Sequence, residues 1–165
     1  MIHNKHKVNI NIMALAWITI FFVFFAWSAI EPEDPIIWAM EVFPAAIGLL
    51  ILAATWNRFH LTGLAYWLIL LHAIILMIGG HYTYAKVPFF DWLKEHFELT
   101  RNNYDKVGHF MQGFVPAIIA RELILRNTPL KNGGWLFAIV ISVISLSYIV
   151  LTRVCELIVK FAEFE

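Results

Sequence analysis

Charged residues are scarce in this chain, and cysteine is almost absent. Only 15% of the 165 residues are Asp, Glu, Lys or Arg, whereas a soluble globular domain carries about 25%. The 12 basic and 12 acidic residues cancel to a formal net charge of zero, so no overall field favours nucleic acid or an acidic partner. The single cysteine, Cys155, excludes a disulfide within the chain.

The sequence also lacks the motifs of the common soluble enzymes. It has no phosphate-binding P-loop, no dinucleotide-binding glycine fingerprint and no G-x-S-x-G turn. Neither C-x-x-C nor H-E-x-x-H occurs, which are the spacings of redox cysteines and of a catalytic zinc. No basic patch interleaved with aromatic residues indicates a nucleic-acid surface. No repeat or long linker divides the chain, so we predict a single integral membrane domain over residues 1–165.

Apolar residues dominate instead. They make up 61% of the sequence, against about 45–50% in soluble domains, and a chain this short has too little interior to bury the excess. Five apolar stretches reach the length of about 20 residues that a bilayer-spanning helix needs. They run over about residues 10–30, 36–56, 61–79, 107–125 and 135–159. The sequence therefore predicts an all-α, polytopic membrane helix bundle with five transmembrane helices.

The distribution of basic residues predicts the orientation of these helices. If the helices alternate, one side of the membrane receives Lys5, Lys7, Arg58, Arg121, Arg126 and Lys131. The first loop on the opposite side, residues 31–34, has no basic residue. The long segment on that side, residues 80–106, has mixed charges that include Lys86, Lys94, Arg101 and Lys106. Since cytoplasmic loops are enriched in Lys and Arg, we place the N-terminus in the cytoplasm. The first stretch exceeds the apolar core of a signal peptide and is interpreted as a retained helix, with cleavage as the alternative.

A short amphipathic segment lies between the third and fourth stretches. Phe89, Leu93 and Phe97 recur at spacings of four residues, with Trp92 beside them, and charged residues occupy the other face. This pattern predicts a short interfacial helix in the lipid headgroup region, with its aromatic side towards the lipid. The alternative is a helix packed on the protein's own outer surface.

Polar residues near the ends of the stretches predict a site. A polar or ionisable group at membrane depth is costly unless it is paired or faces water, so such groups mark candidate sites. With alternating helices, one outer layer receives Glu41, His81, Tyr82, Tyr104, Asp105, His109, Gln112, Arg153 and Glu156. We therefore predict an outward-facing polar cavity near the periplasmic surface.

Asp105 and His109 are the candidate catalytic residues within this set. Their spacing of four residues, with Gln112 three residues further on, places all three on one helix face. An acid and a histidine so placed can pass a proton between them or bind a divalent metal ion, with His81 as a third ligand. The cavity would be completed by other lining residues, namely Glu41, Tyr82, Tyr104 and Glu156.

Each candidate also has a purely structural interpretation. Asp105 is suited to cap its helix, because a carboxylate interacts favourably with the N-terminal end of a helix. In the structural interpretation, His109 is a packed core residue that is held by a hydrogen bond, and Glu156 forms an ion pair with Arg153. His72, in a wholly apolar stretch, is interpreted as a packed neutral side chain.

Three functions are compatible with these residues. The first is an enzyme that uses a metal ion or an acid–base pair on a lipid or lipid-linked headgroup. The second is a component that binds or transports a small solute or ion, which for a chain of this size predicts a homo-oligomer. The third is structural, with the polar groups joining helices through hydrogen bonds. Membrane lipids are the expected partners, and nucleic acid is not.

Several longer patterns resemble a known family. The runs GGHYTYAKVP at residues 79–88 and NYDKVGHFMQGFVPA at residues 103–117, followed by RE at 121–122, closely resemble the YjdF-like bacterial inner-membrane proteins. WSAIEP at residues 27–32 and CELI at residues 155–158 are also similar to that family. The resemblance implies a multi-pass protein of the inner (plasma) membrane and assigns no activity.

Two further expectations come from resemblance. The short run DKVGHF at residues 105–110 resembles an element of VanZ-like membrane proteins, which implies a link to glycopeptide-antibiotic tolerance. The YjdF-like pattern is expected to continue past CELI with an acidic segment and a last helix. A chain that ends at Glu165 is therefore expected to be truncated relative to that family, with part of the predicted site missing.

Overall fold

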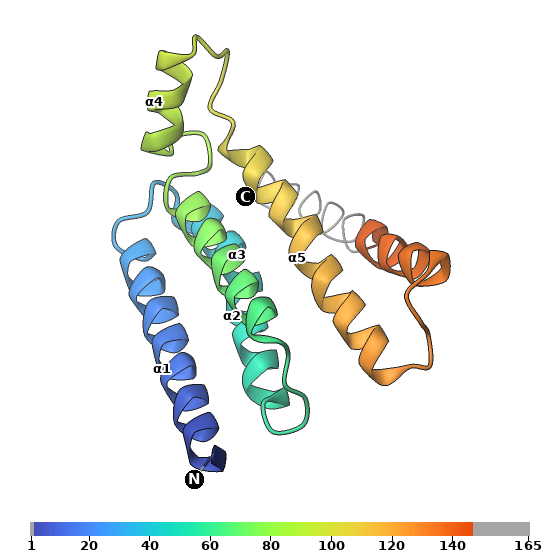
Figure 1. Ribbon diagram of the computed structural model, residues 1–165. Coiled ribbons are helices and arrows are strands. Elements are labelled where there is room, and N and C mark those ends of the chain that lie inside the picture. Colours follow the sequence, from blue (N-terminus) through green and yellow to red (C-terminus); the bar gives the residue numbers. More distant parts are fainter. Residues whose placement is uncertain (1, 147–165) are drawn as a thin grey trace. The chain divides into compact units, whose positions relative to one another are not determined.

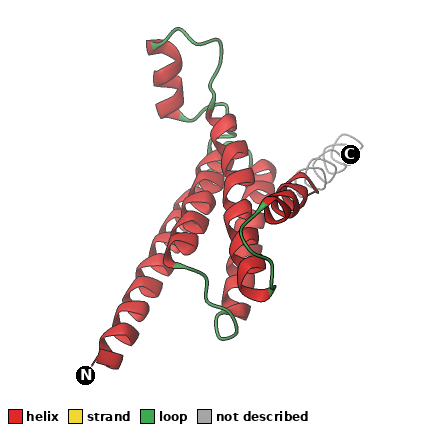
Figure 2. Cartoon of the chain, turned by 45° about the vertical axis from the view of Figure 1, so that its right-hand side comes forward, coloured by secondary structure: helices red, strands yellow, loops and turns green. Residues whose placement is uncertain are grey.

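The computed structural model describes the backbone of residues 2–146 and the side chains of residues 12–146. Within this range every regular element is an α-helix (Figure 2), which confirms the predicted all-α class. The labelled helices are α1 (Ile2–Ser28), α2 (Pro35–Thr55), α3 (Gly63–His81), α4 (Pro88–His96) and α5 (Tyr104–Asn127) (Figure 1). A further apolar helix covers Gly134–Leu146.

Two of these helices, α2 and α3, are long and apolar enough to cross a membrane. The Ile12–Ser28 part of α1 and the helix Gly134–Leu146 are apolar but shorter. Helix α5 coincides with the fourth predicted stretch, and α4 with the predicted amphipathic helix. The described residues thus support a helical membrane protein, while the number of five spans stays a prediction.

The chain divides into two compact units, residues 1–109 and 110–165. In the first unit α3 packs against both α1 and α2 and is therefore the central helix (Figure 1). In the second unit the side chain of Arg121 donates to Asn132 over 2.9 Å. Arg126 and Glu122, four residues apart on α5, form an ion pair of 2.8 Å.

The core of the first unit consists of large apolar residues from its three long helices. Its buried members are Trp17, Phe21, Val42, Ala45, Leu70, Ala73, Leu76 and Met77. The rings of Trp17 and Phe21 stack with centroids 5.6 Å apart. The indole Nε1 of Trp17 donates to the backbone oxygen of Tyr66 over 2.8 Å, so the one polar atom of this ring is satisfied within the apolar core.

Local sequence sets the helix starts. The Asp34 carboxylate accepts hydrogen bonds from the backbone nitrogens of Ile36 and Ile37, and Pro35 occupies the first helical position of α2. This arrangement satisfies backbone donors that the first turn of a helix leaves unpaired. Thr62 caps α3 in the same way by accepting from the nitrogen of Ala65.

The loop between α1 and α2 lies at the same end of the first unit as the turn after α3. The backbone nitrogen of Glu33 donates to the backbone oxygen of His81 over 3.0 Å. The Glu33 carboxylate also pairs with Lys86 at 2.7 Å. These contacts join two chain segments that are far apart in sequence.

Candidate functional site

Glu41 and Tyr84 form a hydrogen-bonded pair at this end of the first unit. Glu41 lies in the second turn of α2, and Tyr84 lies in the turn between α3 and α4. The Tyr84 hydroxyl donates to Oε2 of Glu41 over 2.8 Å. Burial and the neighbouring Glu41 carboxylate both raise the pKa of the Tyr84 hydroxyl, so the phenol keeps its proton and remains a donor.

Glycines on two helices make room for the Tyr84 ring. A Cβ atom added at Gly79 of α3 would lie 2.6 Å from Cε2 of Tyr84, and one added at Gly108 of α5 would lie 2.9 Å from its Cε1. Contacts this short do not occur between real carbon atoms, so both positions require glycine while the ring stays in place. Gly80 makes room for Glu41 at the same end of the unit, because a Cβ atom added at Gly80 would lie 3.2 Å from Cβ of Glu41.

Tyr104 completes the packing around Tyr84. Its ring centroid lies 5.7 Å from that of Tyr84, and its hydroxyl donates to the backbone oxygen of Ile75 over 3.0 Å. Burial raises the pKa of the Tyr104 hydroxyl, which keeps this donor protonated as well. The first turn of α5 is thereby attached to α3.

The turn that carries Tyr84 is conformationally strained. Thr83 and Tyr84 adopt φ angles of 53° and 56°, in the left-handed region that non-glycine residues rarely occupy. Each such residue costs about 1–2 kcal/mol. A hydrogen bond of 2.8 Å from the nitrogen of Tyr84 to the oxygen of Gly79 closes the turn. Strain of this kind persists where surrounding contacts hold it, and it is concentrated at functional sites.

Replacing Thr83 by glycine should therefore stabilise the protein. Glycine adopts a positive φ without the steric penalty of the β-branched Thr83, and we expect T83G to raise the free energy of unfolding by about 1 kcal/mol. Chemical unfolding in detergent micelles measures the change. T100G is the control, because Thr100 has no positive φ and glycine there only increases the entropy of the unfolded chain. Equal destabilisation by both variants would contradict the strain.

A second polar cluster is centred on Ser28, which is fully buried at the end of α1. Its hydroxyl accepts from the indole Nε1 of Trp38 over 3.1 Å. Its backbone oxygen lies 3.2 Å from Nδ1 of His81. The His81 ring also stands 4.6 Å from that of Trp27, and the Tyr82 ring lies beside both. His81 and Tyr82 thus serve to join α1 to α3.

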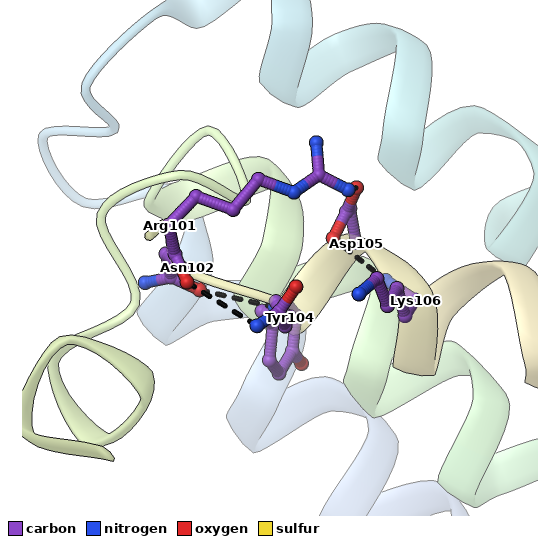
Figure 3. Close-up of polar contacts among 6 residues, drawn as sticks. Arg101, Asn102, Tyr104, Asp105 and Lys106 are labelled. Carbon is purple, nitrogen blue, oxygen red and sulfur yellow. Dashed lines mark hydrogen bonds and ion pairs between the residues drawn. The ribbon is translucent and has the colours of Figure 1, made fainter. Parts of the chain in front are cut away.

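Asp105 lies at the start of α5 and pairs with a neighbouring arginine (Figure 3). Nη2 of Arg101 lies 2.9 Å from Oδ2 of Asp105, and Oδ1 of Asp105 accepts from the backbone nitrogen of Lys106. Asn102 accepts from the nitrogen of Tyr104 over 3.0 Å. The structural interpretation of Asp105 as a residue that stabilises the helix start agrees with these contacts.

His109 interacts electrostatically with Glu41, which lies on another helix. Its imidazole is solvent-exposed, whereas Glu41 is partly buried. The side chains of residues 12–146 include no group of three or more His, Cys, Asp or Glu that is close enough to hold a metal ion. A metal site that combines Asp105, His109 and His81 stays a prediction from the sequence.

The remaining predicted residues are distributed as follows. Gln112 is partly exposed on α5 within the second unit, and Arg153 and Glu156 lie outside the described residues. His72 sits in the middle of α3, and its Nε2 is buried without a hydrogen-bond partner in the part of the chain that the structure describes. Tyr84, which the sequence reasoning missed, is the central residue of the site.

Comparisons with known proteins agree with the membrane character of the fold. A family described as "Predicted membrane protein (DUF2238)" matches residues 13–151. The inner membrane protein YjdF of Escherichia coli strain K12 is 52% identical over 101 residues, which cover 61% of this chain and 48% of that protein. The chain thus spans about half the length of this curated relative. No solved structure matches the sequence.

Proposed function

Because the chain belongs to the family of predicted membrane proteins DUF2238, we propose that it is a multi-pass inner-membrane protein with a proton-exchanging site at its periplasmic end. Glu41, Tyr84 and His109 form this site, which couples a proton to the binding of a small ion or solute. The observation that carries the proposal is the hydrogen bond of 2.8 Å between Tyr84 and Glu41. An ionisable residue inside a membrane-spanning helix is a functional candidate by default, because such residues are rare and costly there.

The three side chains have complementary roles in this proposal. Glu41 accepts the proton or the cation. Tyr84 donates a hydrogen bond to its carboxylate and fixes its position. His109, whose exposed imidazole interacts electrostatically with Glu41, passes the proton between this carboxylate and the aqueous phase.

The contacts between loops support the proposed orientation. Residues 29–34 and 81–87 meet through the contacts of Glu33 with His81 and Lys86, which supports a position on one side of the membrane for both segments. The first of these loops has no basic residue, and the second leads into a segment of mixed charge that carries Lys86, Lys94, Arg101 and Lys106. The first loop and the basic residues of the opposite side favour the periplasm for this side and the cytoplasm for the N-terminus under the positive-inside rule. The site at Glu41 is then open to the periplasm, in an arrangement of five spans.

The proposal is tested with E41Q, whose amide cannot take up a proton. The purified protein is reconstituted into liposomes that contain a pH-sensitive dye, and gradients of Na⁺, K⁺ or ammonium are imposed in turn. We expect at least one of these cations to drive proton movement through the wild-type protein. In E41Q this movement should fall to the level of protein-free liposomes.

E33Q is the matched control for this experiment. It removes the same charge from the exposed Glu33, which pairs with Lys86 at the same end of the unit, so we expect wild-type proton movement. Equal movement in wild type and E41Q would remove Glu41 from the mechanism. Absence of movement in the wild type with all three cations would contradict proton-coupled cation transport.

A further inference from the structure

Helix α4 and its C-cap residue Phe97 carry large aromatic side chains that are mostly exposed. Phe89, Trp92 and Phe97 have exposed fractions of 63%, 55% and 61%. Their rings form a continuous series with that of His96: Phe89 stacks on Trp92 at 6.0 Å, Trp92 stacks on His96 at 5.2 Å, and His96 meets Phe97 edge-on at 5.0 Å. We call these four residues the aromatic ladder. A contiguous apolar surface of this kind indicates an interaction site.

The opposite side of α4 is attached to the rest of the first unit. Phe90 packs edge-to-face on Tyr104, with ring centroids 5.1 Å apart. The side-chain amide of Asn102 donates to Oδ1 of Asp91 and to the backbone oxygen of Val87, each over 3.1 Å. These contacts set the rotation of the helix about its axis, so the aromatic ladder is turned away from the unit to which α4 is attached.

The position of α4 along the chain identifies what the ladder meets. Helix α3, which is long and apolar enough to span a membrane, ends at His81, and α4 begins at Pro88. Six residues reach at most about 20 Å when fully extended. The turn is shorter than that, because the nitrogen of Tyr84 bonds back to the oxygen of Gly79. Helix α4 therefore starts close to the membrane surface, where tryptophan and other aromatic residues are enriched.

We infer that the aromatic ladder of α4 docks into the headgroup layer of the lipid bilayer. The docking is apolar and not driven by charge, because the helix carries Asp91 and Glu95 against the single cation Lys94. It requires no anionic lipid, unlike the basic interfacial helices that bind acidic membranes. The inference is independent of the proton-exchanging site, although Phe90, Tyr104 and Tyr84 connect α4 to Glu41 through successive ring contacts.

The test places a fluorophore at single cysteines in the 165-residue chain. On a C155S background, F89C and F97C report on the ladder, and E95C reports on the charged face of the same helix. Each labelled protein is reconstituted into zwitterionic lipid nanodiscs with or without lipids that carry a nitroxide on the headgroup. We expect several-fold stronger quenching by the nitroxide lipid at positions 89 and 97 than at position 95.

The other outcomes overturn the inference. Equal nitroxide quenching at the three positions means that the ladder does not face lipid. Protection of positions 89 and 97 from both the nitroxide lipid and aqueous iodide identifies a protein, such as a second copy of this chain, as the occupant. Quenching at 89 and 97 that appears only after anionic lipid is added replaces apolar docking with electrostatic attraction. Residues 89, 95 and 97 are exposed, so a cysteine at any of these three positions should not disturb the fold.

Discussion

G79A should strongly destabilise the protein, although alanine is normally the better helix residue. The added methyl group would lie 2.6 Å from Cε2 of Tyr84, so either the ring or helix α3 must move. Overpacking of this kind costs about 1–3 kcal/mol, which exceeds the gain in helix propensity of about 1 kcal/mol. Chemical unfolding in detergent measures the loss. We also expect proton movement in the liposome assay to fall, because a displaced Tyr84 would no longer donate its hydrogen bond to Glu41.

Two other glycines provide a graded comparison. G108A meets the same ring at a distance of 2.9 Å and should be destabilising, but less than G79A. Gly48 in α2 has nothing within 4 Å of its added Cβ, so G48A should be neutral or stabilising by up to about 1 kcal/mol. If G79A and G48A have the same stability, the close packing of Tyr84 against α3 is incorrect.

The second large effect is expected at the hydrogen bond between Tyr84 and Glu41. Y84F removes the donor and leaves a partly buried carboxylate without it, which should lower the free energy of unfolding by about 1–3 kcal/mol. In the E41A background there is no carboxylate that could lose its donor, so Y84F should lower the free energy of unfolding much less. A double-mutant cycle over the four proteins should therefore give a coupling energy of about 1.5–3 kcal/mol.

Y82F is the control for this cycle. Tyr82 lies in the same turn, and phenylalanine can keep its ring contacts with Trp27 and His81, so we expect a change within about 0.5 kcal/mol. A coupling energy near zero between positions 41 and 84 would show that the two side chains act separately. Tyr84 would then have no role in positioning Glu41.

The helices could be predicted from the sequence because they depend on features that a sequence carries directly. Long apolar stretches correspond to α2 and α3, and the short amphipathic pattern corresponds to α4. The two runs that resemble the YjdF-like proteins, at residues 79–88 and 103–117, fall within the region that the family match covers. The number of spans could not be settled in the same way. Helix α5 is long enough to cross a membrane but carries more polar residues than α2 and α3, which are the two described helices apolar enough to do so.

The site was predicted only in outline. Glu41 was expected at one end of the bundle, and the spacing of Asp105 and His109 predicted that these two act together, which stays a prediction. Arg101 lies four residues before Asp105 and takes its carboxylate, whereas His109 interacts with Glu41 from another helix. The spacing rule describes neighbours on one helix and carries no information about partners on the next.

Tyr84 escaped prediction for a related reason. It lies in a turn, where no helical or strand periodicity indicates which way a side chain points. Its signal is instead the pair Gly79 and Gly108, which are far from each other in the sequence and both contact its ring. Recognising that signal requires knowing that the two helices meet. The left-handed conformation of Thr83 and Tyr84 is likewise invisible to propensity, because neither residue favours it.

The enclosure of Tyr84 by two helices has a consequence for biosynthesis. Gly79 and the turn itself leave the ribosome before Gly108, which belongs to the first turns of α5. Until that later segment emerges, one flank of the phenol ring is uncovered and the strained turn lacks its last support. The contact with Glu41 therefore matures only as α5 joins the earlier helices, so α5 acts as the closing element in the assembly of the site.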